Sequence, residues 1–204
     1  MIHVTCRAEP KDFENLVRKP GLDFLQKSSA PSWQEWNAHR YWSRINQDLY
    51  KLYNGVCAYT GQWFPLTLTD ASVDHFLPKS KYPKLAYEWT NYRLTTIKIN
   101  RRKDQFLLEI DPFRIKNGWF QLDIPSCLLK PNSLLSEQLK SKIKKVIDIL
   151  KLNDDDRMVQ ERADTLLDYA NGNINFEFLK KRYPFLAFEI ARQNLKDNLN
   201  QYFL

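Results

Sequence analysis

Residues 72–103 read SVDHFLPKSKYPKLAYEWTNYRLTTIKINRRK, and this stretch decides the expected fold. Residues 73–76 alternate apolar and polar side chains, as a half-buried strand does. Pro78 ends this strand because proline has no N–H to donate to a strand ladder. Asp74 and His75 are therefore expected at a strand end.

A second strand and a helix follow in the same stretch. Residues 92–95 predict another short strand, and Thr96 can cap a helix that carries Asn100 and Lys103 on neighbouring turns. Strand, loop, strand and helix would bring a carboxylate, an imidazole and a carboxamide around one small cleft. Such a set suits phosphoryl transfer, and it predicts a metal-dependent phosphodiesterase site.

The same residues, in the same order, resemble the HNH endonucleases, whose ββα-metal motif carries Asp-His on its first strand, Asn in the loop and His or Asn on the helix. This chain has Asp74-His75, Asn91 and Asn100, followed by Lys103. The resemblance implies that Asp74 and Asn100 hold a divalent cation and that His75 is the general base. It also implies that Asn91 braces the loop and orients His75, and it covers about a sixth of the chain.

Physical chemistry agrees with these roles. One charged and one neutral oxygen ligand suit Mg²⁺ or Mn²⁺, and an imidazole with a pKa near 6.5 can take a proton from water at neutral pH. We assign a catalytic role to Lys103 as well, with a contact to the substrate backbone. The nucleic-acid-binding residues are expected to be Lys79, Lys81, Arg101 and Arg102.

Charge and aromatic residues point to the same partner. The chain has 31 Lys and Arg against 24 Asp and Glu, a net charge of +7. Between residues 79 and 103, eight cations face a single acid, Glu88. Cations can follow phosphates and aromatic rings can stack on unpaired bases, so nucleic acid, DNA ahead of RNA, is the expected partner. A solvated basic face is the alternative, and two of the aromatic residues here, Tyr87 and Trp89, are expected in the core.

Three cysteines, odd in number and far apart, argue against a disulfide framework. Many HNH proteins carry two cysteine pairs that bind a structural zinc. Here Cys57 stands where the first pair would begin, but its partner position holds Thr60, so we expect no structural zinc and a buried Cys57. No apolar run could span a bilayer and no signal-peptide core is present, so a cytoplasmic protein without membrane contact is expected.

The flanking sequence predicts mostly helices around this core. Residues 2–6 and 56–59 suggest strands, with 63–68 returning beside the latter, and Pro20-Gly21 is expected to break an early helix. Ser32 to Glu35 form a capping box that opens a helix running to Leu52. Asn117-Gly118 predicts a hairpin, and the chain is helical from Asn132 onward, with Asp154 to Asp156 opening one helix rather than binding calcium. His3 and His39 are expected to be structural or surface residues.

These expectations define an α+β protein with a ββα-metal core and mostly α-helical additions at both ends. The expected parts are an N-terminal helical wrapper (1–55), the nuclease core (56–111) and a hairpin with a C-terminal helical region (112–204). The motif and its Trp89-Thr90-Asn91 continuation also resemble the stand-alone HNH proteins of bacterial anti-phage systems, such as the Septu PtuB type, some of which accompany retrons. That resemblance implies a partner ATPase. The alternative is a catalytically silent module that binds nucleic acid or a partner.

Overall fold

The structure is a computed structural model that describes residues 1–66, 71–154 and 156–202. Residues 67–68, at the end of a predicted strand, and Asp155 lie outside the described residues. The chain divides into two compact units, which we call the site unit and the C-terminal unit. The site unit comprises Thr5–Cys57 and Phe64–Leu108, and the C-terminal unit comprises Met1–Val4, Ala58–Trp63 and Glu109–Leu204.

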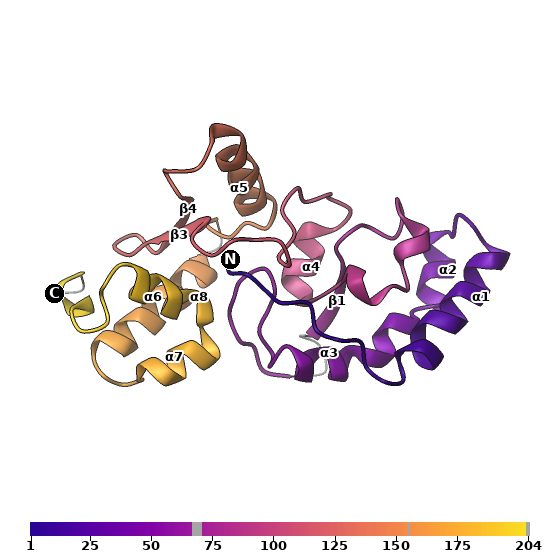
Figure 1. The fold of residues 1–204 in the computed structure, drawn as a ribbon, viewed down its shortest axis with the longest axis horizontal. Coiled ribbons are helices and arrows are strands. Elements are labelled where there is room, and N and C mark those ends of the chain that lie inside the picture. The colour runs from indigo at the N-terminus through magenta and orange to yellow at the C-terminus, as the bar shows by residue number, and fades with distance from the viewer. Residues whose placement is uncertain (67–70, 155, 203–204) are drawn as a thin grey trace. The chain divides into compact units, whose positions relative to one another are not determined.

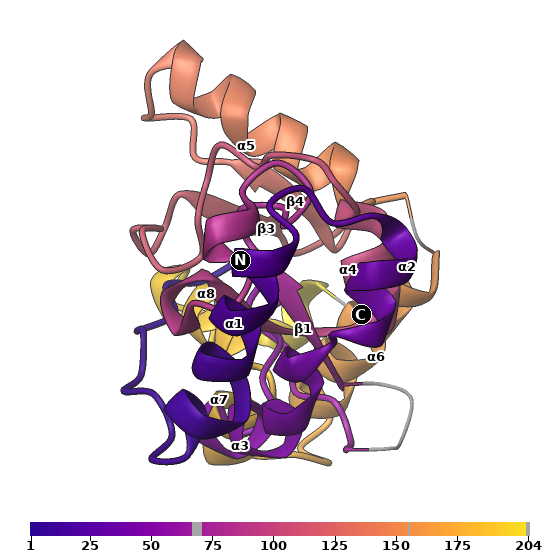
Figure 2. The ribbon, with the colours of Figure 1, turned by 90° about the vertical axis from the view of Figure 1, so that its right-hand side faces the viewer.

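The centre of the site unit is a pair of antiparallel strands followed by a helix. β1 (Ala71–His75) pairs with β2 (Tyr92–Thr96), with His75 opposite Tyr92 and Asp74 opposite Arg93. α4 (Ile97–Lys103) starts directly after β2, and the Thr96 side chain accepts a hydrogen bond from the Ile99 amide at its first turn. Figures 1 and 2 both show α4 against β1. The two predicted strands and the capped helix are therefore confirmed.

The remaining helices of the site unit precede β1. They are the π-helix η1 (Glu14–Arg18), α1 (Lys19–Lys27), α2 (Trp33–Ala38), the 3₁₀-helix η2 (Tyr41–Ile45) and α3 (Asn46–Leu52). Two short 3₁₀-helices, η3 (Pro83–Leu85) and η4 (Trp89–Asn91), lie between β1 and β2. The aromatic rings of Phe24, Trp36, Trp42 and Tyr87 form a continuous cluster with centroid separations of 5.8–6.5 Å. The predicted burial of Tyr87 and Trp89 is confirmed.

Two predictions about these helices were wrong. Pro20 does not break the early helix: the π-helix η1 runs directly into α1 with helical backbone at Arg18 and Lys19, and Pro20 lies in the turn that follows this π-helical segment. Gly21 continues the same helix and lets it approach the Tyr87 ring, which a Cβ at Gly21 would meet at 2.1 Å. The helix from Ser32 does not reach Leu52 either. It stops at His39, whose ring stacks on Phe24 at 3.8 Å and whose Nδ1 lies 2.8 Å from the Glu35 carbonyl oxygen.

In its described residues, the C-terminal unit contains the second strand pair followed by a series of helices. β3 (Phe120–Asp123) pairs antiparallel with β4 (Leu128–Pro131). α5 (Glu137–Ile149), α6 (Asp156–Ala170), α7 (Phe176–Arg182) and α8 (Pro184–Arg192) follow, and the 3₁₀-helix η5 (Leu199–Tyr202) ends the described chain. The predicted helical region is confirmed. The last α-helix, α8, ends at Arg192.

The hairpin lies later in the chain than predicted. Asn117-Gly118 is a turn, with Gly118 at φ +87°, but it precedes β3 instead of joining two strands. The connecting turn follows Asp123, whose carboxylate accepts hydrogen bonds from the Ser126 amide and hydroxyl at 3.4 and 2.6 Å. No strand forms at residues 2–6 or 56–59, where turns and irregular backbone are found instead.

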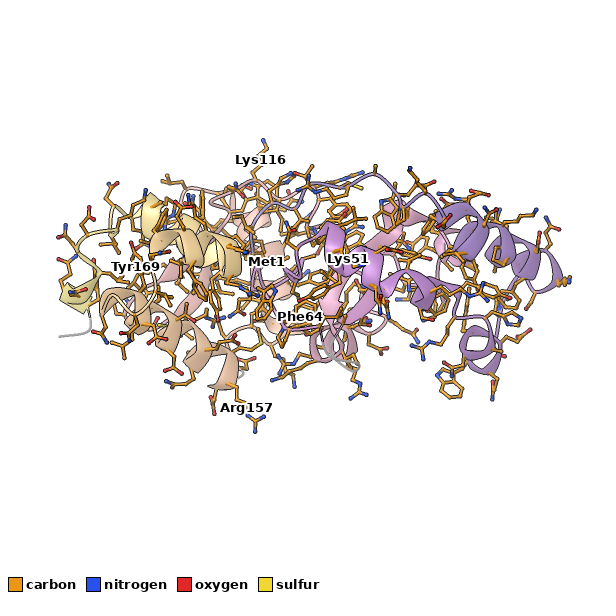
Figure 3. The ribbon with its side chains drawn as sticks, turned by 90° about the horizontal axis from the view of Figure 1, so that it is seen from below. Met1, Lys51, Phe64, Lys116, Arg157 and Tyr169 are labelled. Atoms are coloured by element: carbon orange, nitrogen blue, oxygen red, sulfur yellow. The ribbon has the colours of Figure 1, made fainter. Side chains whose placement is uncertain are left out.

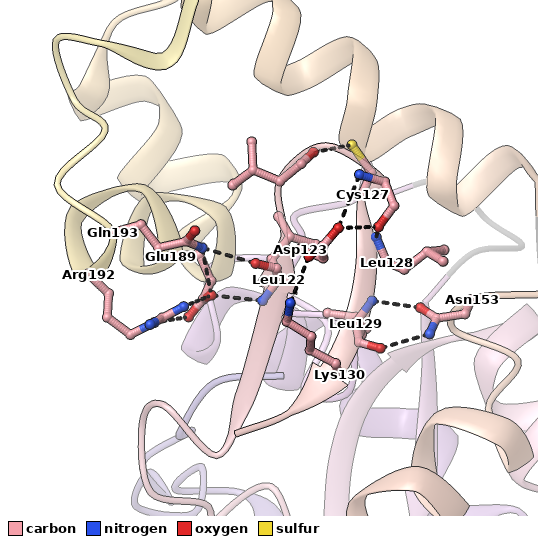
Figure 4. A network of polar contacts seen from close by, with 12 residues as sticks. Leu122, Asp123, Cys127, Leu128, Leu129, Lys130, Asn153, Glu189, Arg192 and Gln193 are labelled. Carbon is pink, nitrogen blue, oxygen red and sulfur yellow. Dashed lines mark hydrogen bonds and ion pairs between the residues drawn. The ribbon is translucent and has the colours of Figure 1, made fainter. Parts of the chain in front are cut away.

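Buried polar contacts join the elements of the C-terminal unit (Figure 4). Glu189 of α8 is fully buried, and its carboxylate accepts hydrogen bonds from the Leu122 amide at 2.7 Å and from Arg192 at 2.7 and 2.9 Å. The Asn153 side chain pairs with the backbone N–H and C=O of Leu129, both at 2.8 Å. These contacts fix the β3–β4 pair to α8 and to the turn before α6.

Candidate active site

The candidate site surrounds a cavity of about 640 Å³ within the site unit. β1 contributes Ser72, Val73, Asp74 and His75, and α4 and the residue after it contribute Asn100, Arg101 and Asp104. Other lining residues come from the loop after β1 and from the α2–η2 region; they include Trp33, Arg40, Trp42 and Lys79. The structure thus brings the predicted Asp74, His75 and Asn100 to one cavity, although they lie on two separate elements.

His75 is held in one orientation by its hydrogen bond and its aromatic neighbours. Its Nε2 lies 2.9 Å from the carbonyl oxygen of Ala86, and its ring packs edge-on against Trp42 and Tyr92. Since a carbonyl oxygen can only accept, Nε2 must carry the proton, and Nδ1 holds the lone pair. Burial, reinforced by the nearby Lys79 ammonium, lowers the pKa of His75 to about 3. The imidazole is therefore neutral at physiological pH.

Asn91 holds the loop that supplies this carbonyl. Its side-chain oxygen accepts from the Leu77 amide at 2.8 Å, and its amide nitrogen donates to the carbonyls of Leu77 and Leu85, both at 3.0 Å. It therefore ties together the two ends of the loop, and the second tie is one residue before Ala86. The side chain contacts the loop and not the imidazole, so any effect of Asn91 on His75 passes through the backbone.

Asn100 and Asp74 both line the cavity, and each is held by contacts within the site unit. The Asn100 amide nitrogen donates to the Ser72 hydroxyl at 2.7 Å and to the Val73 carbonyl at 3.1 Å. Because that carbonyl requires a donor, the Asn100 Oδ1 is turned to the opposite side. Asp74 is 2% exposed, and one of its oxygens lies 3.0 Å from the Lys103 ammonium.

Lys103 is not at the surface, although the sequence suggested that it contacts the substrate backbone there. The side chain is 0% exposed, and its ammonium donates to the His75 carbonyl at 2.8 Å as well as pairing with Asp74. A buried ammonium with two partners on β1 does not reach a phosphate at the surface. The structure places Lys103 as a link between α4 and the strand that carries Asp74 and His75.

The other predicted cations fall into two groups. Lys79 and Arg101 line the cavity, and the Lys79 ammonium lies 5.4 Å from the Trp42 ring centroid. Burial lowers the pKa of Lys79, and the Asp74 carboxylate opposes this shift. Lys81 is exposed and donates to the Gln105 carbonyl at 3.3 Å, and neither it nor Arg102 is among the lining residues. Figure 3 shows that the exposed basic side chains of Lys116 and Arg157 also extend from the ribbon elsewhere.

Several lining residues were not predicted from the sequence, among them Asp104, Arg40 and Trp33. Asp104 follows α4 with φ +42° and ψ −123°, a backbone conformation that a non-glycine residue rarely adopts. Its position four residues after Asn100 could have indicated that both face the same side of the helix. Arg40 and Trp33 come from the α2–η2 region, about 35 to 60 residues from the motif, and no local pattern connects them to it.

The side chains of the cavity that could bind a metal ion offer mainly oxygen atoms, which are hard ligands. The Asp74 carboxylate, the Asn100 side-chain oxygen and the Asp104 carboxylate are of the type that Mg²⁺ and Mn²⁺ prefer. Among the described residues, no group of three or more His, Cys, Asp or Glu side chains is arranged to hold a metal ion. Cys57 is buried, with its sulfur 3.4 Å from the Thr95 hydroxyl, as expected of a small core residue.

The two other histidines have structural surroundings. The His3 amide donates to the Asn117 side chain at 2.9 Å, its Nδ1 lies 3.0 Å from the Ile115 carbonyl oxygen, and His39 stacks on Phe24. Neither lines the cavity. No helix within the described ranges has both the length and the apolar character needed to cross a membrane.

Comparison with known proteins shows one informative similarity. No family model matches the chain. The Septu protein PtuB of Bacillus thuringiensis is 28% identical over 164 residues, which represent 79% of this chain and 58% of that protein. The chain therefore spans little more than half the length of this relative. The similarity supports a PtuB-like relationship, and it extends well beyond the motif of residues 72–103.

Proposed function

We propose that this protein is a metal-dependent endonuclease of the HNH type that hydrolyses phosphodiester bonds in nucleic acid. The observation that carries the proposal is the convergence of Asp74, His75 and Asn100 on one cavity, with the His75 Nε2 committed to the Ala86 carbonyl. The order of β1, β2 and α4 agrees with the ββα arrangement that the resemblance implies.

His75 is the general base in this proposal. Its Nδ1 is the basic atom, since Nε2 is protonated and bound; the low pKa of the ring keeps Nδ1 unprotonated at neutral pH but also makes it a weaker base than a free imidazole. The Ala86 carbonyl stabilises the positive charge that the ring gains when it takes a proton from water. Asn91 positions that carbonyl by holding both ends of the preceding loop.

Asp74 and Asn100 would hold the divalent cation; Asp104 lines the same cavity. When bound, Mg²⁺ or Mn²⁺ supplies positive charge that offsets the negative charge developing on the phosphate. Asn100 presents its Oδ1 because its nitrogen is engaged by β1. Lys103 of α4 is a positioning residue that holds the Asp74 carboxylate of β1, and Lys79 and Arg101, which line the cavity, would bind phosphate oxygens.

Cleavage of plasmid DNA and of RNA by the full chain in millimolar Mg²⁺ tests this proposal. His75→Ala should lower the rate at least about 100-fold, because it removes the base. His39→Ala is the matched control, since His39 belongs to the same unit but does not line the cavity. Circular dichroism checks that both variants fold. An equal rate for His75→Ala and wild type, or cleavage that persists in a chelator, would contradict the proposal.

A catalytically silent binding module is the second candidate. The close pair between Lys103 and Asp74 favours it, because a buried ion pair already satisfies one carboxylate oxygen that a cation would use. This candidate predicts nucleic-acid binding without cleavage, both for the chain alone and together with a partner ATPase encoded beside it. Cleavage that depends on His75 rejects it.

The similarity to the Septu protein PtuB supports a further part of the proposal, a role in anti-phage defence together with a partner ATPase. Plaque counts on bacteria that express the chain, alone and with a candidate partner ATPase, test this role. Protection should be lost with His75→Ala and kept with His39→Ala. Equal protection by both variants would separate defence from the proposed chemistry.

A further inference from the structure

Trp33 is an exposed aromatic residue on the wall of the candidate site. It lines the same cavity as Asp74 and Asn100, yet its side chain is 75% exposed. Single exposed apolar side chains are common on protein surfaces, so exposure alone means little. The position is what distinguishes Trp33. Its neighbour Trp36 is buried in the aromatic cluster, and Trp33 is therefore the residue of α2 with a ring free to meet a ligand at this cavity.

Cations accompany this ring along the cavity wall. Arg40 and Arg101 are exposed lining residues, and Lys79 lies above Trp42 deeper in the same wall. The carboxylate of Asp74 is paired with Lys103. An aromatic surface next to guanidinium groups matches the alternation of flat bases and phosphates along a nucleic-acid strand.

The dimensions and the ring favour a single strand over a duplex. A cavity of about 640 Å³ has the size of sites that take small molecules, which include single nucleotides. Bases inside a duplex are already stacked on both faces, so Trp33 could not stack on them without unpairing. Exposed Asn37, Ser80 and Gln105 add hydrogen-bonding groups to the lining, as edges of unpaired bases require.

We propose that Trp33 stacks on an unpaired base at this cavity and makes single-stranded or looped nucleic acid the preferred substrate class. This proposal names the substrate class of the proposed nuclease site. Its consequence for cleavage rests on the proposed nuclease function. The stacking itself is a binding property and is measurable without cleavage. Of the aromatic residues in the basic stretch, Tyr87, Trp89 and Tyr92 are core residues, and Tyr82 is exposed but does not line the cavity, so the exposed ring at the cavity comes from α2.

Fluorescence anisotropy with labelled oligonucleotides in EDTA tests the proposal with the full chain. The probes are a dodecamer of thymidine, a dodecamer of uridine, and a mixed-sequence duplex of equal length. Trp33→Ala should weaken binding of the single strands roughly 5- to 150-fold, as loss of one stacked base predicts, and leave duplex binding within about twofold. Trp33→Phe should retain most of the affinity. Phe178→Ala, which removes an exposed ring of α7 outside the cavity, is the matched control.

The outcomes separate this proposal from the nuclease assignment. Unchanged single-strand binding by Trp33→Ala, a wild-type preference for duplex, or no binding of any probe overturns the stacking role. Equal dependence on Trp33 for binding polyglutamate would also overturn it and indicate an acidic peptide as the occupant. If single-strand binding depends on Trp33 but the wild-type chain does not cleave nucleic acid, the stacking role is retained and the nuclease function is rejected. The thymidine and uridine probes show whether DNA or RNA is preferred.

Discussion

Replacing Lys103 with methionine removes the ammonium that links α4 to β1 and keeps the length of the side chain. The ammonium is fully buried and lies 3.0 Å from the Asp74 carboxylate and 2.8 Å from the His75 carbonyl. Removing one partner of a buried ion pair leaves the other charge poorly compensated, which costs about 3–5 kcal/mol. Since Asp74 has further interactions, we expect the lower end, a loss of about 3 kcal/mol in the free energy of unfolding.

Urea unfolding followed by tryptophan fluorescence measures this loss. Lys180→Met is the control, because the Lys180–Glu177 pair has a similar separation of 2.6 Å but is solvent-exposed, and its removal should change stability by less than about 1 kcal/mol. The double variant with Asp74→Asn should recover part of the loss, because no buried carboxylate remains. A loss below about 1 kcal/mol for Lys103→Met would show that the link is not structural and would refute this reasoning.

Other predictions concern pH, packing and capping. The unfolded chain binds a proton at His75 below about pH 6.5, whereas the folded chain does so only near pH 3. The free energy of unfolding should therefore be at its full value above about pH 6.5 and fall on acidification, by up to about 1.4 kcal/mol per pH unit. His75→Phe should flatten this part of the curve of urea midpoint against pH. Gly21→Ala should lower the free energy of unfolding by about 3 kcal/mol, because the new Cβ would meet the buried Tyr87 ring at 2.1 Å. Gly172→Ala has open space around it but a φ of +76°, and should cost about 1 kcal/mol. Equal shifts in melting temperature for the two variants would contradict this. Ser32→Ala should cost about 1 kcal/mol by removing the cap of α2, and Ser32→Asp should not, so an equal loss of helicity in both would show that the cap is not the cause.

The elements next to the site were predictable because their signals are local. The capping box of Ser32 and Glu35 depends on atoms three residues apart, and both of its hydrogen bonds are present, at 2.8 and 3.3 Å. The Thr96 cap and the alternation before Pro78 are equally short-range. In contrast, the interruption at His39 depends on stacking against Phe24, and the continuation through Gly21 depends on Tyr87, which is 66 residues away in the chain.

The same distinction applies within the candidate site. The sequence predicted which residues belong to it, since Asp74-His75, Asn91 and Asn100 occur in a recognisable order. It misjudged Lys103, because no sequence pattern shows whether a lysine at the end of a helix faces solvent or the strand beneath. It also missed Asp104, which directly follows α4, and Arg40 and Trp33, which line the cavity only after the segment before β1 folds onto it.

The sequence by itself determined the strand-loop-strand-helix order, the helix caps and the identity of the oxygen and nitrogen donors, because each depends on neighbours within a few residues. Only the tertiary structure decided the protonated nitrogen of His75, the burial of Lys103 and the aromatic residue at the cavity wall. The physical reason is that hydrogen-bond partners and solvent exposure are set by groups that are distant in the chain. Ala86, for example, is 11 residues beyond His75, and its methyl side chain gives no indication that its backbone carbonyl binds the imidazole.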